Sequence, residues 1–416
     1  MSITTHTPVP AGIDIFTKDQ IEHFLSRCPE RLGIKMEDLF SLGQETPDSA
    51  GFNMAVFAIR TSSMVNGVSN LHRHVARKLW ERVLQEEEFD LGDQFTDKKS
   101  GKKMRSVTNG VHIASWISDS MANLLDEYLG HQWISAPWQP ETWRAIYKIP
   151  SDKLWSVRQE SRSKLLEYVQ RKQAGRNNRL DRNALTIGFA RRFATYKRAT
   201  LLFSDRSHLE HLLQDEERPI QFVFAGKAHP RDHEGKKFIQ EINTFLKGET
   251  SKGKIIFLQD YDIDVARNMV QGVDVWLNNP RRPLEASGTS GMKVLCNGGI
   301  NLSVLDGWWD EAYTPSNGWA IGTGTTDANQ SLQDRQDAES LYDLLQNHVV
   351  GEFYDRTSGI PLKWIDRVRR SMSGLTPRFS SSRMVIEYAE NFYFKNIRKP
   401  DPDKKFEVVK PPTQNE

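Results

Sequence analysis

Residues 285–297 read Glu-Ala-Ser-Gly-Thr-Ser-Gly-Met-Lys-Val-Leu-Cys-Asn, and the interpretation of the whole chain starts from this stretch. Gly288 and Gly291 flank the small polar residues Thr289 and Ser290. Such a segment can bend so that several backbone N–H groups point toward one place. The stretch therefore predicts a loop that can hold an anion or a sugar oxygen.

The residues that follow this loop favour a helix from residue 292 to residue 296. The loop N–H groups would then lie at the positive end of that helix, which suits a phosphate. Lys293 falls in the first turn, where an aldehyde cofactor with a phosphate tail would need an amine beside an anion site. Glu285 places a carboxylate at the entrance, suited to a sugar hydroxyl. A strand–turn–helix corner with a solvated lysine explains the same residues equally well, because Gly-rich loops are common.

The composition leaves room for two ordinary domains and gives no bulk electrostatic preference. The chain has 416 residues, with 56 basic and 54 acidic side chains and a net charge of +2, which argues against a nucleic-acid or membrane partner. Cys28 and Cys296 lie far apart, as expected in a reducing compartment without a disulfide framework. No apolar run approaches the ~20 residues of a membrane helix, and no signal-peptide pattern is present. We expect a cytoplasmic protein.

From residue 184 onward, short apolar runs alternate with segments of helical periodicity. The apolar runs are 184–190, 220–224, 254–258, 273–277 and 300–305, and helical segments include 200–215 and 231–246. This alternation predicts a parallel, doubly wound sheet. Ligands bind such sheets beyond the carboxyl ends of the strands. The candidates that fall there are Arg191, Arg192, Tyr196, Lys197, Arg198, Gly226, Lys227, Tyr261 and the segment 285–293.

The sequence Arg-Arg-Phe-Ala-Thr-Tyr-Lys-Arg at residues 191–198 is a second candidate for anion binding. Four cations within eight residues repel one another unless anions neutralise them or water screens them. Arg192 can grip a phosphate through two hydrogen bonds, and Lys197 can act as a point charge. A solvated basic loop is the plainer interpretation, since charge runs usually face water.

The rest of the chain is predicted to be mostly helical. Residues 3–8 read as the end of a strand that runs into a loop. Thr17 begins an amphipathic helix over 17–32, and residues 53–84 are predicted to be mostly helical. Further helices are expected at 118–129, 151–172, 333–349 and 361–371. A solvated charge run at 86–88 and a polar linker to residue 103 follow the helical region 53–84, and a polar loop is expected at 311–329.

Two pairs of histidines raise the question of a metal site. His72 and His74 form a His-x-His pair, and His229 and His233 flank a Pro-Arg-Asp segment. One such pair is a weak metal signal without further ligands nearby. We expect surface or packing roles and no metal.

Long motifs resemble the α-glucan (glycogen, maltodextrin and starch) phosphorylases. Residues 285–293, with Asn297-Gly298 and Leu305-Asp306-Gly307, are similar to the cofactor-lysine region of that family. Residues 307–311, Gly-Trp-Trp-Asp-Glu, resemble its short prokaryotic branch. The similarity runs from Thr5-His6-Thr7-Pro8 to the helix around 379–393. Residues 65–69, Val-Asn-Gly-Val-Ser, resemble the family's turn between two helices, so the resemblance implies a turn there. Residues 107–112 resemble the hinge at which the family's chain passes between its two lobes.

The resemblance implies a two-lobed α/β fold of the glycosyltransferase-B type. Residues 1–108 would be a mostly helical remnant of the N-terminal lobe, and 109–375 a Rossmann-like C-terminal lobe that binds cofactor and phosphate. Residues 376–398 would form a crossover helix, and 399–416 a disordered, Pro- and Lys-rich tail. The chain would then be the C-terminal part of a longer enzyme.

The resemblance also implies reversible phosphorolysis of an α-1,4-glucan by inorganic phosphate, releasing glucose 1-phosphate, with pyridoxal 5'-phosphate bound through Lys293. The expected catalytic and substrate residues are His6, Asn109, Arg192, Lys197 and Glu285. The expected cofactor residues are Trp116, Arg191, Tyr261, Gly288, Thr289, Ser290 and Lys293. In one departure from the long animal enzymes, Tyr261 is followed by Asp262 where they have an arginine, so another cation must compensate.

Two other functions remain open. A non-catalytic fragment could bind cofactor, a homo-oligomeric partner or the missing part of the N-terminal lobe. A nucleotide-sugar glycosyltransferase could share the fold, although such enzymes need no lysine like Lys293. The sequence leaves the glucan length, allosteric control and oligomeric state undetermined.

Overall fold

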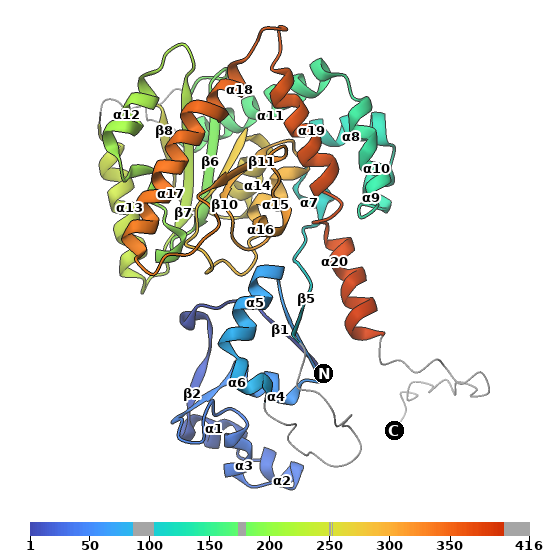
Figure 1. The fold of residues 1–416 in the computed structure, drawn as a ribbon, viewed down its shortest axis with the longest axis vertical. Coiled ribbons are helices and arrows are strands. Elements are labelled where there is room, and N and C mark those ends of the chain that lie inside the picture. Colours follow the sequence, from blue (N-terminus) through green and yellow to red (C-terminus); the bar gives the residue numbers. More distant parts are fainter. Residues whose placement is uncertain (86–103, 174–179, 249–250, 252, 395–416) are drawn as a thin grey trace, which may run out of the picture.

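The computed structural model describes residues 1–85, 104–173, 180–248, 251 and 253–394. A large C-terminal part holds a six-stranded sheet, and a smaller N-terminal part lies against one end of it (Figure 1). The expected linker at 86–103 and the expected tail at 399–416 lie outside the described residues.

The large sheet is parallel and doubly wound, as predicted. Its strands are β6 (Leu185–Arg192), β7 (Ile220–Lys227), β8 (Ile255–Leu258), β9 (Val275–Asn278), β10 (Ile300–Val304) and β11 (Gly318–Ile321). Their order is β11-β10-β9-β6-β7-β8, and every pair is parallel. The strand order reverses between β6 and β9, which creates a topological switch point at the carboxyl ends of these two strands.

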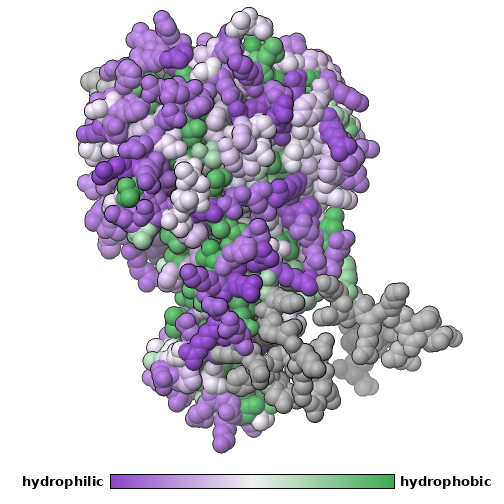
Figure 2. Space-filling view, in the orientation of Figure 1, coloured by the Kyte–Doolittle hydropathy of each residue, from purple (hydrophilic) through white to green (hydrophobic). Residues whose placement is uncertain are grey.

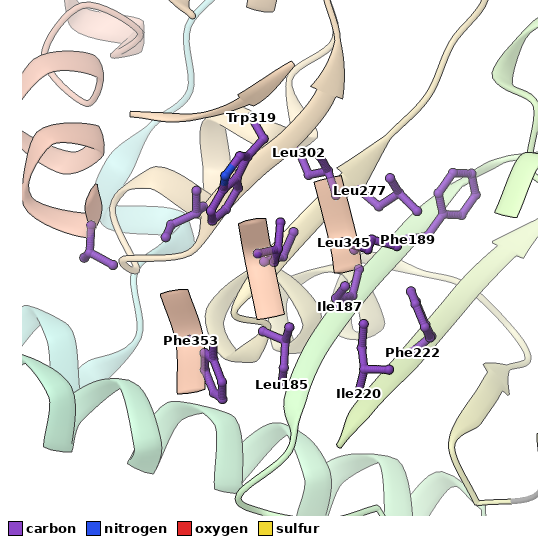
Figure 3. Close-up of a cluster of buried hydrophobic side chains, with 14 of the residues drawn as sticks. Leu185, Ile187, Phe189, Ile220, Phe222, Leu277, Leu302, Trp319, Leu345 and Phe353 are labelled. Carbon is purple, nitrogen blue, oxygen red and sulfur yellow. The ribbon is translucent and has the colours of Figure 1, made fainter. Parts of the chain in front are cut away.

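Alternate residues of the strands enter two separate hydrophobic cores. On one face, Leu185, Ile187 and Phe189 of β6 pack with residues of β7, β9 and β10 (Figure 3). On the other face, Ala190 of β6 and Trp276 of β9 pack with the neighbouring helices. This period of two is the side-chain alternation of a strand that is buried on both faces.

Helices cover both faces of the sheet. The first face is covered by α12 (Arg206–Gln214), α13 (His233–Phe245), α17 (Gln330–Leu344), α18 (Val350–Tyr354) and α19 (Leu362–Leu375). The second is covered by α14 (Ile263–Gly272), α15 (Ser290–Leu295) and the second half of α11 (Ser151–Lys172). Further helices are α7 (Ile113–Trp116), α8 (Asp119–Leu129), α9 (Gln132–Ser135), α10 (Pro140–Arg144) and α16 (Trp309–Ala312).

The polar loop predicted at 311–329 is wrong in part, because β11 lies within it. Residues Gly318–Ile321 pair with β10, and Trp319 is buried against Trp364. The four residues of β11 begin with a glycine and do not alternate between apolar and polar side chains, so the sequence does not indicate a strand. Their strand conformation follows from pairing with the sheet edge.

The N-terminal part contains a small three-stranded parallel sheet, whose second and third strands the sequence did not predict. Its strands β1 (Ser2–Thr5), β4 (Met64–Gly67) and β5 (Met104–Ser106) lie in the order β1-β4-β5. The expected turn at 65–69 is therefore wrong for residues 65–67, and the helix expected over 53–84 is interrupted. Val65 is fully buried between Ile3 and Met104, so pairing on both sides overrides the surrounding helical pattern.

Short helices surround this small sheet. They are α1 (Lys18–Leu25), α2 (Cys28–Leu32), α3 (Met36–Ser41), α4 (Met54–Thr61), α5 (Asn70–Leu79) and α6 (Glu81–Gln85), with an antiparallel pair β2 (Ile15–Thr17) and β3 (Gly51–Asn53). Thr17 caps α1 as predicted. The single helix expected over 17–32 is wrong, because Pro29 lies in the first turn of a second helix and cannot continue the first.

The last described α-helix connects the two parts of the molecule. α20 (Ser381–Tyr388) leaves the large part and runs toward the smaller one (Figure 1). Asn66 of β4 donates to the Tyr388 hydroxyl at 3.0 Å. Figure 2 shows a mostly hydrophilic face over the large part, with more hydrophobic surface where the two parts meet. Within the described residues, no helix combines the length and the apolar character needed to cross a bilayer.

Candidate functional site

The candidate site lies at the switch point of the large sheet. Arg191 and Arg192 end β6, and the segment 285–293 follows β9, the strand beside it. The structure therefore brings together two motifs that lie about a hundred residues apart in the sequence, because parallel strands end at the same edge.

A buried cluster of charges joins these motifs. Arg191 forms an ion pair with Glu285, and Nζ of Lys197 lies 3.6 Å from the same carboxylate. Burial opposes the charge of Glu285, but the two cations outweigh it and lower the pKa of Glu285. Burial, and then the charge of Arg191, lower the pKa of Lys197 to about 8. Glu285 is thus the counter-ion of the cluster, a role that the sequence did not assign to it.

The other two arginines of the 191–198 segment have different surroundings. The side chain of Arg192 is exposed, with no hydrogen bond or ion pair recorded to another described residue. Arg198 is buried, donates to the carbonyls of Asn279 and Pro280, and pairs with Asp337 at 2.7 Å. Arg198 is therefore part of the scaffold, whereas Arg192 is available to a ligand.

The loop after Glu285 is fixed by contacts on three sides. The backbone N–H of Glu285 donates to Asp306 at 2.9 Å, and the N–H of Trp308 donates to the carbonyl of Ser287 at 2.8 Å. From the N-terminal part, Ser69 donates to the carbonyl of Ala286 at 2.6 Å. Burial raises the pKa of Asp306 to about 8, although two N–H groups donate to this carboxyl. These contacts hold the loop rigid before any ligand binds.

The predicted loop residues lie together in this fixed segment. Gly288 has a φ of 71°, a conformation that favours glycine. Thr289 precedes α15 without a side-chain capping bond. The Ser290 hydroxyl accepts a hydrogen bond from the Trp276 indole at 3.1 Å, which fixes the start of the helix against β9. The loop–helix prediction is confirmed for α15, which begins at Ser290.

Lys293 and Trp116 are in direct contact. Nζ of Lys293 lies 3.8 Å from the centroid of the Trp116 ring. Lys293 is half-buried, and burial lowers the pKa of its amine. No ion pair of Lys293 with another described residue is recorded. Its amine instead makes a cation–π contact with Trp116 and is partly shielded from water.

Tyr261 lies close enough to Arg191 for the arginine charge to influence its hydroxyl. Burial raises the pKa of Tyr261, and Arg191 opposes that rise. The neighbouring Asp262 caps α14, since its side chain accepts the Val265 N–H at 2.8 Å. The residue that departs from the long phosphorylases therefore has a local structural role, and Arg191 is the cation near Tyr261.

His6 and Asn109 lie on the N-terminal side of this region. The backbone N–H of Asn109 donates to Val68 at 3.1 Å, next to the Ser69 that contacts Ala286. His6 is exposed just after β1. No contact of either side chain with the Arg191–Glu285 cluster is recorded among the described residues.

His72 and His74 have different surroundings. His72 is buried and contacts Thr5, whereas His74 is exposed. Within the ranges that the structure describes, no group of three His, Cys, Asp or Glu side chains could hold a metal ion. Cys28 and Cys296 are both free thiols.

The residues at the switch point fit a phosphate-bearing aldehyde cofactor. Nη1 of Arg191 is buried and has no hydrogen-bond partner among the described residues. An anion would satisfy this nitrogen, and the amine of Lys293, in the segment that follows β9, is suited to an aldehyde. The site therefore has both chemical groups that pyridoxal phosphate requires.

Three residues that support the site were not assigned roles from the sequence. Asp306 and Asn297 stand in the motifs, and Ser69 lies far from them in sequence. The residue types of Asp306, Asn297 and Ser69 do not predict these contacts. The contacts depend on which backbone groups the fold places beside the three side chains.

A doubly wound sheet with buried cations and a half-buried lysine at its switch point, joined to a smaller lobe, defines a two-lobed α/β protein of the glycosyltransferase-B type. The sequence model of the carbohydrate phosphorylases matches residues 19–348. The chain belongs to the carbohydrate phosphorylase family.

Several relatives match almost the whole chain. It is 41% identical over 403 residues to a maltodextrin phosphorylase of Thermococcus litoralis, covering 95% of this chain and 46% of that protein. It is 38% identical over 411 residues to a glycogen phosphorylase of Aquifex aeolicus, with coverages of 95% and 57%. A glycogen phosphorylase of Mycobacterium tuberculosis is 39% identical over 414 residues, with coverages of 94% and 46%. The chain spans about half the length of these relatives.

Proposed function

We propose that this chain carries the cofactor- and phosphate-binding part of an α-1,4-glucan phosphorylase. The reaction is reversible phosphorolysis of the glucan by inorganic phosphate, releasing glucose 1-phosphate. The observation that carries the proposal is that one switch point holds both the half-buried amine of Lys293 and the buried Nη1 of Arg191, which has no hydrogen-bond partner among the described residues. The names of the relatives, maltodextrin and glycogen phosphorylases, agree with this substrate class.

Each site residue has a role in this proposal. Lys293 attaches pyridoxal phosphate, with Trp116 packed beneath its amine and Arg191 and Tyr261 near the cofactor phosphate. Gly288, Thr289 and Ser290 supply the loop between them. When bound, the cofactor supplies a phosphate that exchanges a proton with the substrate phosphate.

The substrate side of the site uses the remaining predicted residues. Arg192 and Lys197 bind inorganic phosphate, and their charges offset the repulsion between two neighbouring phosphates. Glu285 keeps Arg191 and Lys197 in place and orients a glucose hydroxyl. His6 and Asn109 contact the glucose from the N-terminal side.

The domain division belongs to the same proposal. Residues 1–108 form part of the N-terminal lobe, 109–375 the C-terminal lobe and 376–398 a crossover helix. The Asn66–Tyr388 hydrogen bond and the Ser69–Ala286 contact support this arrangement. Because the relatives are about twice as long, a partner that completes the N-terminal lobe, or a second copy of the chain, is included in the proposal. A cytoplasmic location, which the free thiols favour, also stays a proposal.

The test is covalent capture of pyridoxal phosphate. The purified chain is incubated with the cofactor, reduced with borohydride and mapped by mass spectrometry. We expect the label on Lys293, loss of the label in Lys293→Ala, and retention in Lys153→Ala, which removes an exposed lysine. Cofactor absorbance that survives Lys293→Ala would refute the assignment. Glucose 1-phosphate release from maltodextrin and phosphate then tests the reaction.

A further inference from the structure

Asn297 connects the two residues that form the lysine site. Its side chain is fully buried just after α15, four residues after Lys293. Nδ2 donates to the carbonyl of Lys293 at 3.1 Å and to the carbonyl of Trp116 at 2.9 Å. Oδ1 accepts the backbone N–H of Ser118 at 2.8 Å. One amide group thus contacts the helix that carries the lysine and the segment that carries the tryptophan.

The network fixes the orientation of this amide. Two carbonyl acceptors face one side of the group, and one N–H donor faces the other. Rotating the amide by half a turn would place Oδ1 against the two carbonyl oxygens and Nδ2 against the backbone N–H of Ser118. The backbone of Asn297 is held as well, because buried Arg158 donates to its carbonyl at 2.7 Å. The side chain therefore has one fixed orientation and is shielded from water, and hydrogen bonds are strong in such an environment.

We propose that Asn297 is a positioning residue that holds the amine of Lys293 against the ring of Trp116 by tying together their two backbone carbonyls. The proposal rests on the assignment of Lys293 as the cofactor lysine. Trp116 lies at the end of the short helix α7, and α15 has only six residues, so neither element is long enough to fix its own direction. The shared amide supplies the missing constraint, as groups behind a functional side chain commonly do.

The chain offers a matched control at Asn317. This asparagine is also buried, accepts the Thr314 N–H through Oδ1 and donates to the carbonyl of Ala312 through Nδ2. Asn297→Asp and Asn317→Asp each keep the acceptor and remove the donor. Asn297→Leu is uncharged and separates the lost hydrogen bonds from the added negative charge. Urea unfolding shows whether each variant is folded under the assay conditions.

The readout is the pKa of the Lys293 amine, measured from the pH dependence of its acetylation by acetic anhydride and peptide mass spectrometry. In the wild type, burial lowers this pKa. We expect Asn297→Asp and Asn297→Leu to release the amine toward water and raise its pKa. A rise of one pH unit would reduce the neutral fraction, and hence the labelling rate near pH 7, about tenfold. Asn317→Asp should label at the wild-type rate.

Two results would overturn the proposal. One is a Lys293 pKa in folded Asn297→Asp and Asn297→Leu equal to that of Asn317→Asp. The other is failure of both Asn297 variants to fold while Asn317→Asp folds, which would make Asn297 a stability residue. Acetylation needs no cofactor, so this comparison remains decisive even if the wild type fails to capture pyridoxal phosphate. That failure would refute the proposed function alone.

Discussion

Burial of His72 should make the N-terminal part of the protein sensitive to mild acid. The imidazole is only 1% exposed, and its Nε2 contacts the carbonyl of Thr5 at 3.2 Å. Burial lowers the pKa of His72 from 6.5 to about 4, while the bond to Thr5 opposes and the nearby His6 reinforces this change. Between these pH values the unfolded chain binds a proton that the native state does not. Stability is therefore complete above the unfolded pKa and is lost as the pH falls from 6.5 toward 4.

The two pKa values of His72 give the size of the effect. At about pH 5, the unfolded imidazole is almost fully protonated and the native one is mostly neutral, which corresponds to a loss of about 2 kcal/mol. Below the native pKa the loss approaches about 3 kcal/mol. His72→Gln removes this proton uptake, because a glutamine stays neutral and can still donate to the Thr5 carbonyl. We therefore expect the variant to lose about 2 kcal/mol less than the wild type between pH 7 and 5.

Hydrogen exchange of the peptide that contains β4 and His72 measures this difference. The opening free energy is obtained by mass spectrometry near pH 5 and near pH 7, after correction for intrinsic exchange rates. His74→Gln is the control, because His74 is exposed two residues away. If wild type and His72→Gln lose the same free energy on acidification, His72 is not held neutral in the native state and the reasoning is refuted.

Three further substitutions test the charge cluster and the loop. Glu285→Gln should destabilise the protein by about 3–5 kcal/mol in urea unfolding, because it leaves the buried Arg191 unpaired; a midpoint like that of the wild type would contradict this. Arg198→Leu should destabilise the protein by a similar ~3–5 kcal/mol, because it leaves the buried Asp337 without its cation. A decrease in Tm smaller than that of a variant at an exposed arginine would contradict this prediction. Gly288→Ala should cost about 1–2 kcal/mol because φ is positive, whereas Gly351→Ala, which meets open space within α18, should not destabilise; equal effects of the two would be inconsistent with strain at Gly288.

Much of the C-terminal sheet could be predicted from the sequence. The runs that became β6 to β10 are apolar, short and separated by segments of helical periodicity, and these signals depend only on local residue order. The candidate residues follow the carboxyl ends of those strands, so they were expected at one edge of the sheet. β4 and β11 escaped prediction because each lies inside a segment with the pattern of a helix or of a polar loop, and takes its strand conformation from its neighbours in the sheet.

The sequence by itself determined the alternating α/β architecture, the loop before Lys293 and the set of cationic residues near the switch point. Only the tertiary structure decided which cations are neutralised and which remain available. Glu285 reaches Arg191 across 94 residues of sequence, Arg198 turns into the scaffold, and Arg192 stays exposed. The amide of Asn297 likewise acquires its role from two carbonyls brought beside it. The physical reason is that ion pairs and buried hydrogen bonds depend on distances between chain segments, and the local order of residues does not specify those distances.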